Sequence, residues 1–166
     1  MVEQIIEVDE NNQQIGLRPR TDFFGKKFIH RSVHLIIFNS KNEILLQLRS
    51  RTKKLYPNLI TYSVDGTVAN ESYEECIQRE VKEELGISLK VKRLFTFPCF
   101  DEYDKAWRCV FVGKTDKKLT PDPRETQELK WVTPDELKKD LVKNPSKYVP
   151  TFVEGMKMYF TEFYNK

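Results

Sequence analysis

Three glutamate residues stand at helical spacing near the middle of this chain. Glu80, Glu83 and Glu84 lie at positions i, i+3 and i+4 of residues 71–85, the segment most typical of a helix, which Gly86 ends. Side chains at these spacings share one face, where like charges destabilise a helix by about 0.2–0.5 kcal/mol per pair. A bound hard cation would offset this repulsion, and magnesium takes oxygen ligands. The spacing therefore predicts a site for a divalent metal ion.

A second interpretation of the same glutamates is an acidic face exposed to solvent. Arg79 and Lys82 lie close enough along a helix to pair with them, and runs of charge are usually solvated. The neighbouring residues weaken this interpretation, because the pattern extends well beyond the glutamates. Glu71 is followed by seven residues and then by the run 79–87, REVKEELGI.

The segment 65–87, DGTVANESYEECIQREVKEELGI, resembles the Nudix box, the signature of a family of hydrolases. The resemblance implies that Glu80, Glu83 and Glu84 are catalytic and bind Mg²⁺, with Mn²⁺ as the alternative ion. It also makes Glu80 a candidate general base. The implied reaction is attack of a metal-activated water on a phosphorus atom of a small diphosphate, expected at family level to be a nucleoside diphosphate derivative.

The rest of the box is expected to shape the site. The resemblance implies a structural ion pair between Glu71 and Arg79, and Gly86 occupies the final glycine position. One departure occurs at the start, where Asp65 stands in place of the first glycine and Gly66 follows one residue late. Since glycine lets the backbone approach metal and phosphate closely, the geometry of this loop is the open question of the box.

Many enzymes with this box take one more carboxylate from outside it. Glu128, near Glu125 and before an expected strand, is the candidate for a fourth metal ligand. Asp101, Glu102 and Asp104 are further candidates. Each of these residues taken alone is also explained as an ordinary surface acid.

Basic residues crowd the loop that follows an expected strand. Arg49, Arg51 and Lys54 are expected to bind the phosphates of the substrate, with Lys53 as a further candidate, and Arg49 stands closest to the strand. A solvated surface is the alternative for this group. Trp107 and Phe100 are candidates for stacking on a base, although core packing is the usual role of large aromatic residues.

Outside the box, residues 9–16, 30–39 and 44–64 resemble the branch of the family related to type I isopentenyl diphosphate isomerase. That enzyme needs a cysteine and a glutamate on opposite faces of its substrate, and a histidine-rich metal site. Here Asp65 stands where the isomerase has its cysteine, and Thr67 where it has a metal-binding histidine.

Other isomerase positions are also changed. No glutamate occurs in 104–106, where the isomerase glutamate would fall, and Phe23 replaces one histidine although His30 matches another. For His30 and His34, packing or capping is the ordinary role. We therefore expect an isomerase-like scaffold that runs hydrolase chemistry. The alternatives are isomerase activity and a non-catalytic module that senses nucleotides.

Apolar periodicity and turn residues predict strands and helices along the whole chain. The expected strands are 3–8, 15–17, 34–38, 43–49, 59–64, 89–98, 107–113 and 129–132, and the expected helices are 71–85, one starting at 133–136, and 150–164. Together they predict an α+β fold of the Nudix type: an α/β/α sandwich with a mixed, largely antiparallel sheet.

The composition fits one domain over residues 1–166. A net charge of +3, from 28 basic and 25 acidic residues, is too balanced for a binder of nucleic acid polymers or a membrane surface. Three cysteines without paired spacing indicate neither a zinc site nor a disulfide framework. We expect a cytoplasmic enzyme that acts on a small diphosphate, and the resemblance makes a homodimer an expectation as well.

Overall fold

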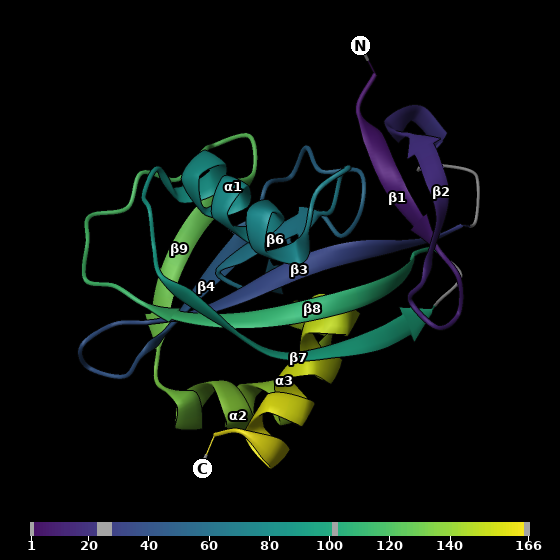
Figure 1. Ribbon diagram of the computed structural model, residues 1–166. Coiled ribbons are helices and arrows are strands. Elements are labelled where there is room, and N and C mark those ends of the chain that lie inside the picture. The colour runs from purple at the N-terminus through teal and green to yellow at the C-terminus, as the bar shows by residue number, and fades with distance from the viewer. Residues whose placement is uncertain (1, 23–27, 101–102, 165–166) are drawn as a thin grey trace.

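The computed structural model of the protein describes residues 2–22, 28–100 and 103–164. Within these residues, nine strands form one mixed sheet, and three α-helices pack on it (Figure 1). The strands are β1 (Gln4–Val8), β2 (Gln14–Pro19), β3 (Ile29–Phe38), β4 (Ile44–Arg49), β5 (Ile60–Thr61), β6 (Val64–Thr67), β7 (Val91–Phe100), β8 (Lys105–Lys114) and β9 (Thr126–Val132). The helices are α1 (Tyr73–Leu85), α2 (Pro134–Lys143) and α3 (Pro150–Glu162).

The long strand β3 organises the sheet. It runs antiparallel to β1, β4 and β6 and parallel to β8, so the sheet is mixed with mostly antiparallel pairs. Its register with β6 places His34 opposite Asp65, and its register with β8 places His30 opposite Ala106. These pairings bring polar residues that are distant in the sequence to one end of the sheet.

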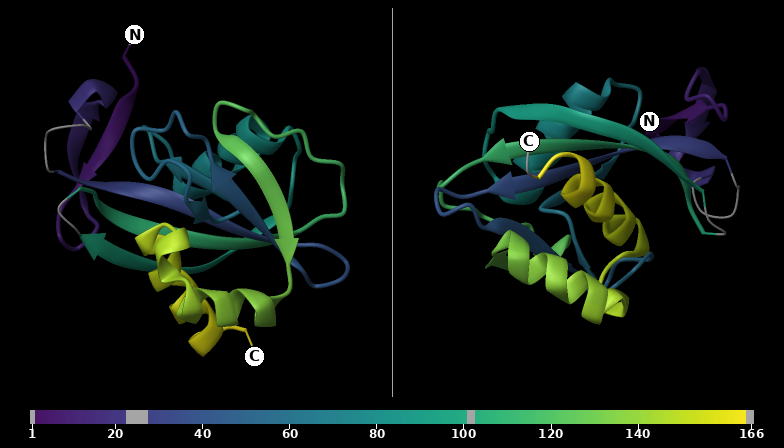
Figure 2. Two further views of the ribbon diagram at one scale, coloured as in Figure 1. Left: turned by 180° about the vertical axis from the view of Figure 1, so that it is seen from behind. Right: turned by 90° about the horizontal axis from the view of Figure 1, so that it is seen from below.

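Helices cover both faces of the sheet, as the α/β/α prediction required. Helix α1 lies on one face, and α2 and α3 lie side by side on the other (Figures 1 and 2). Alternation along β3 serves both layers, because Leu35 and Ile37 belong to the core under α1 whereas Ile36 belongs to the core under α2 and α3. The predicted fold class is confirmed. No helix in the described part of the chain combines the length and apolar character needed to cross a bilayer.

Helix α1 presents an apolar face to the sheet, and its glutamates lie beside that face, with Glu84 itself buried. Tyr73, Cys76, Ile77, Val81 and Leu85 are buried at spacings of three and four residues. Each fully buried side chain of this size stabilises the fold by roughly 1.5–3 kcal/mol. This packing fixes the rotation of the helix, and therefore where its glutamates point.

Several predicted boundaries differ from the structure; β3 begins at Ile29 rather than at residue 34, for example, and β9 at Thr126 rather than at residue 129. Two of the differences have a clear local cause. The helix expected from residue 71 begins after Ser72, because Ser72 and Glu75 form a capping box: the Ser72 side chain accepts from Glu75 N, and the Glu75 carboxylate accepts from Ser72 N. The single strand expected over 59–64 is two short strands, β5 and β6. Between them Ser63 Oγ accepts from Ile37 N at 2.9 Å and donates to Leu45 O at 2.7 Å, which turns the chain from one strand to the next.

Candidate active site

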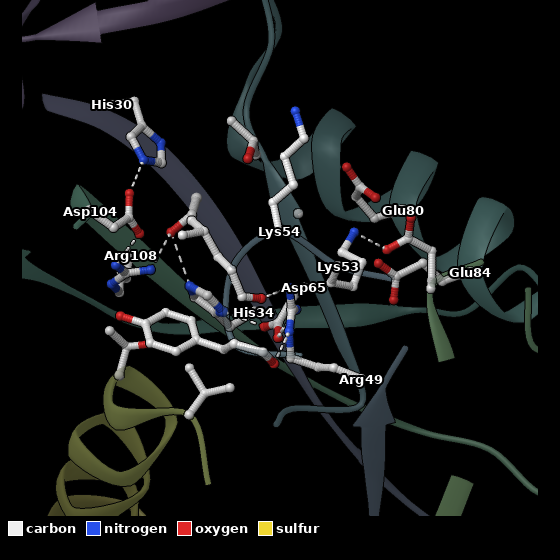
Figure 3. Close-up of a pocket in the computed structure, with 18 of the residues that line it drawn as sticks. His30, His34, Arg49, Lys53, Lys54, Asp65, Glu80, Glu84, Asp104 and Arg108 are labelled. Atoms are coloured by element: carbon white, nitrogen blue, oxygen red, sulfur yellow. Dashed lines mark hydrogen bonds and ion pairs between the residues drawn. The ribbon is translucent and has the colours of Figure 1, made fainter. Parts of the chain in front are cut away.

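A cleft of about 580 Å³ opens between the acidic face of α1 and the loop 50–58. Strands β3, β6 and β8 and the first turn of α3 contribute the remaining walls. The cleft has an acidic side on α1, a basic side on the loop, and a deep end lined by histidine, aspartate and arginine (Figure 3).

All three glutamates expected to bind metal line this cleft, at different depths. Glu84 is buried with 4% of its surface exposed, the Glu80 side chain is 13% exposed, and the Glu83 side chain is 58% exposed. Gln47 donates from Nε2 to Glu84 at 3.0 Å. The row therefore leads from solvent at Glu83 to the cleft floor at Glu84.

The electrostatics of the two inner glutamates are unusual for carboxylates. Burial raises the pKa of Glu80 to about 7, against a lowering effect of Arg79. Burial raises the pKa of Glu84 well above its ordinary value, and the charges of Glu80 and Asp65 raise it further. A nearby positive charge would stabilise the ionised form of both carboxyl groups.

Arg79 supplies part of that charge, and the two amino groups of its guanidinium contact different carboxylates. Its NH2 group donates to Glu71 at 2.5 Å, which is the ion pair expected from the box. Its NH1 group donates to Glu80 at 2.8 Å and to Glu83 at 3.2 Å. The pair with Glu71 therefore leaves the other amino group for the acidic face.

The two residues at the start of the box lie on strand β6. A Cβ atom on Gly66 would come within 2.3 Å of Glu80 Cγ, so glycine is required for Glu80 to pack against the strand. Asp65 points into the cleft, where Oδ1 lies 2.5 Å from His34 Nδ1 and Oδ2 accepts from Thr61 Oγ1 at 2.6 Å. The close approach needed at this point is thus provided by the second residue, Gly66.

The basic side of the cleft contains only some of the expected residues. Arg49 and Lys54 line it, together with Lys53, whereas Arg51 is exposed and is not among the lining residues. Lys53 Nζ pairs with Glu125 Oε2 at 2.5 Å across the mouth of the cleft. Arg49 uses Nε and NH2 to donate to the backbone of the loop.

Of the carboxylates expected outside the box, two line the cleft and one lies away from it. Glu125 is a lining residue, and Glu128 is exposed on β9, where it pairs in register with Leu48. Asp104 also lines the cleft, at its deep end. Asp101 and Glu102 lie outside the described residues.

The deep end holds a continuous chain of polar contacts. His30 Nε2 lies 2.7 Å from Asp104 Oδ1, and Arg108 NH2 donates to Asp104 Oδ2 at 2.6 Å. Arg108 NH1 lies 3.5 Å from Ser32 Oγ, which lies 3.0 Å from His34 Nε2. Burial outweighs the nearby Asp65 charge and lowers the pKa of His34.

Ser32 and Arg108 were not among the residues predicted for the site. A signal for this end of the cleft was nevertheless present. His30, Ser32 and His34 occupy every second position of β3, which places three polar side chains on one face of the strand.

The candidate aromatic residues for base stacking lie elsewhere. Trp107 packs against the core under α1, and Phe100 is 43% exposed at the end of β7. Neither is among the residues that line the cleft. Its apolar lining comes from Leu55, Tyr56 and Val149.

The carboxylate oxygens of the α1 glutamates are suitable ligands for a hard divalent cation. Within the described residues no three His, Cys, Asp or Glu side chains converge as a preformed metal site. Glu84 is nevertheless buried and Glu80 largely so, and the charges of these two carboxylates on one cleft wall disfavour one another. Oxygen donors of this kind suit Mg²⁺ or Mn²⁺.

Comparison with known proteins gives consistent results. A model of the NUDIX domain family matches residues 28–152. A prenyl-diphosphate phosphatase from Methanosarcina mazei is 42% identical over 162 residues, covering 95% of each chain. An isopentenyl-diphosphate Delta-isomerase from Nocardia farcinica is 29% identical over 91% of each chain. A crystal structure of a Deinococcus radiodurans protein superposes with a TM-score of 0.75 at 28% identity, covering 86% of this chain and 90% of that one.

Proposed function

Since the chain belongs to the Nudix family and is a Nudix hydrolase, we propose that it cleaves the diphosphate group of a small organic diphosphate with a water molecule activated by divalent metal ions. One observation carries this proposal. Two glutamates, the buried Glu84 and the largely buried Glu80, face the lysines of loop 50–58 across a single cleft. Such a cleft can hold an anion and the cations that neutralise it.

The glutamates of α1 would hold the metal. Glu80 and Glu84 would ligate Mg²⁺ or Mn²⁺ from the inside of the cleft, and Glu83 from its mouth. When bound, the metal lowers the pKa of water and neutralises charge on the phosphate oxygens. Glu80 is the group we assign to accept the proton of the attacking water. Arg79 would keep its pair with Glu71 through NH2, whereas the contacts of its NH1 with Glu80 and Glu83 would give way to the metal.

The remaining site residues follow from their positions. Lys53 and Lys54 line the cleft opposite α1, so we assign them to the phosphates, and Arg51 lies too far out for this role. Glu125 is a better candidate than Glu128 for the metal ligand outside the box, because only the former lines the cleft.

The organic group is proposed to be a prenyl chain. The relative from Methanosarcina mazei carries this substrate in its name, and Leu55, Tyr56 and Val149 offer apolar cover within the cleft. A nucleoside diphosphate derivative is the second candidate, and it is weakened because neither Trp107 nor Phe100 reaches the cleft.

Isomerase chemistry is less well supported by the same residues. The position of the isomerase cysteine holds Asp65, whose carboxylate is engaged by His34 and Thr61. In the stretch 104–106, Asp104 is paired with His30 and Arg108. These side chains are committed to one another, and none supplies a thiol.

Hydrolysis is tested with purified protein and a panel of dimethylallyl diphosphate, geranyl diphosphate and nucleoside diphosphate derivatives, with and without magnesium. We expect magnesium-dependent phosphate release from a prenyl diphosphate, and a loss of about 100–1000-fold in Glu84→Gln with the fold retained. The same mixtures are checked for interconversion of isopentenyl and dimethylallyl diphosphate. Nucleotide binding without any product release would support a sensing module and refute the hydrolase proposal.

A further inference from the structure

The loop 50–58, called the lysine loop below, has an unusual backbone. Tyr56 and Asn58 both adopt left-handed conformations, with φ of 52° and 60°. Residues other than glycine seldom occupy this region unless surrounding contacts hold them there. Because Lys53 and Lys54 stand on this loop, whatever holds it also sets where two positive charges meet the cleft.

Arg49 makes two of the side-chain contacts that hold the lysine loop. Its Nε donates to the carbonyl of Tyr56 at 3.2 Å, and its NH2 donates to the carbonyl of Leu55 at 3.0 Å. Its backbone N–H donates to the carbonyl of Leu59 at 2.9 Å. The side chain is 14% exposed. A guanidinium is a rigid fork of donors, so the two side-chain bonds fix the loop relative to the end of β4.

Asp65 in turn faces the guanidinium. Arg49 NH1 lies 4.0 Å from Asp65 Oδ2, which also accepts from Thr61 Oγ1. The other carboxylate oxygen contacts His34 on β3. Asp65, on β6, is therefore held by Thr61 on β5 and by His34 on β3, and it faces Arg49 from this fixed position. Figure 3 shows Arg49, Asp65 and His34 together beneath the two lysines.

We propose that Arg49 and Asp65 are positioning residues: Asp65 orients the Arg49 guanidinium, which holds the lysine loop so that Lys53 and Lys54 meet the diphosphate. This inference rests on the proposed function for its ligand, and it replaces the expectation that Arg49 itself binds phosphate. It also gives a role to Asp65, which stands where the family pattern has glycine.

Charge and positioning make opposite predictions for Asp65. A carboxylate that lines an anion-binding cleft repels the anion, so its removal by charge alone should tighten binding. If Asp65 positions the loop, its removal should weaken binding instead. Asp104 provides the matched control, because it is an aspartate in the same cleft that pairs with His30 and Arg108 at the deep end.

The experiment compares Asp65→Asn, Arg49→Lys, their combination, and Asp104→Asn with the unaltered chain. Binding of methylenediphosphonate with magnesium is measured by calorimetry, and amide hydrogen exchange of the lysine loop is measured without ligand. We expect Asp65→Asn and Arg49→Lys each to weaken binding about tenfold and to speed loop exchange about tenfold. The combination should be no worse than either single change, because both break one linkage. Asp104→Asn should leave loop exchange unchanged and should not weaken binding.

Turnover gives a second readout on any diphosphate that is hydrolysed. Asp65→Asn should raise KM about tenfold and leave kcat within twofold, whereas a group acting on the reacting atoms would change kcat. If Asp65→Asn does not fold, Thr61→Val removes a hydrogen bond to the same oxygen and should speed loop exchange in the same direction.

Three results would overturn the inference: unchanged loop exchange in Asp65→Asn, equal or tighter binding in that variant, or full retention of binding in Arg49→Lys. Failure of the proposed function is separate. A protein that hydrolyses nothing in the panel but shows the expected changes in loop exchange would retain the positioning role of this pair.

Discussion

Replacing Glu80 with glutamine should stabilise the metal-free protein at alkaline pH while removing most of its hydrolase activity. The reason is that burial raises the pKa of Glu80 from 4.5 to about 7. A raised pKa means that the folded state binds the proton more tightly than the unfolded state. Stability from this group is therefore complete below about pH 4.5 and is lost as the pH rises through about 7.

The size of the effect follows from the shift. One pKa unit corresponds to 1.36 kcal/mol, so ionised Glu80 costs the folded state up to about 3 kcal/mol at pH 8. Rearrangement of the cleft and entry of water reduce this, and we expect ~1–3 kcal/mol. For a chain of this length that is an increase in Tm of about 3–9 °C in Glu80→Gln at pH 8, and close to none at pH 4.5.

The assay is thermal unfolding in EDTA at several pH values, with Glu83→Gln as the control. Glu83 lies on the same helix face but its side chain is 58% exposed, so its replacement should shift Tm little at any pH. Hydrolysis by Glu80→Gln should fall about 100–10,000-fold. The reasoning is refuted if Glu80→Gln is no more stable than the unaltered protein at pH 8 in EDTA, or if Glu83→Gln gains as much.

Three further predictions concern other parts of the cleft. Gly66→Ala places a methyl group 2.3 Å from Glu80 Cγ and should lose about 1–3 kcal/mol in urea unfolding together with most phosphate release; an unaltered variant would contradict the packing described. Because the pKa of buried His34 is lowered, the unfolded state binds more protons at this residue below about pH 6.5. The urea midpoint of His34→Gln, measured relative to that of the unaltered chain, should therefore rise as the pH is lowered from 7.5 to 5.5. Glu125→Gln should reduce magnesium-dependent hydrolysis at least tenfold more than Glu128→Gln. The opposite order would identify Glu128, on β9, as the metal ligand outside the box.

Local signals in the sequence carried much of the fold. The apolar spacing of Cys76, Ile77, Val81 and Leu85 defines the buried face of α1, and the acidic face follows from it without tertiary information. The predicted start of α1 is two residues too early, because Ser72 caps the helix and Tyr73 is its first residue. The mixed sheet and the two helical layers followed from the order of strands and helices.

The rest of the candidate site depends on the register between strands that are distant in the sequence, which could not be predicted. That Asp65 meets His34 depends on how β6 pairs with β3, and no local pattern specifies that pairing. The choice between Glu125 and Glu128 depends on an irregularity in the pairing of β9 with β4, which follows Leu48. A shift of one residue turns a side chain to the opposite face of a strand, so sequence proximity alone could not separate the two.

The ion pair between Lys53 and Glu125 has a thermodynamic consequence. Each partner is suited to a ligand of opposite sign, since the carboxylate attracts a metal ion and the ammonium attracts a phosphate. A cation that recruits Glu125 releases Lys53 for the anion, and an anion that recruits Lys53 releases Glu125 for the cation. The two ligands should therefore strengthen each other's binding by the same factor, as reciprocity between linked sites requires. Without ligands, Lys53 and Glu125 pair with each other across the mouth of the cleft.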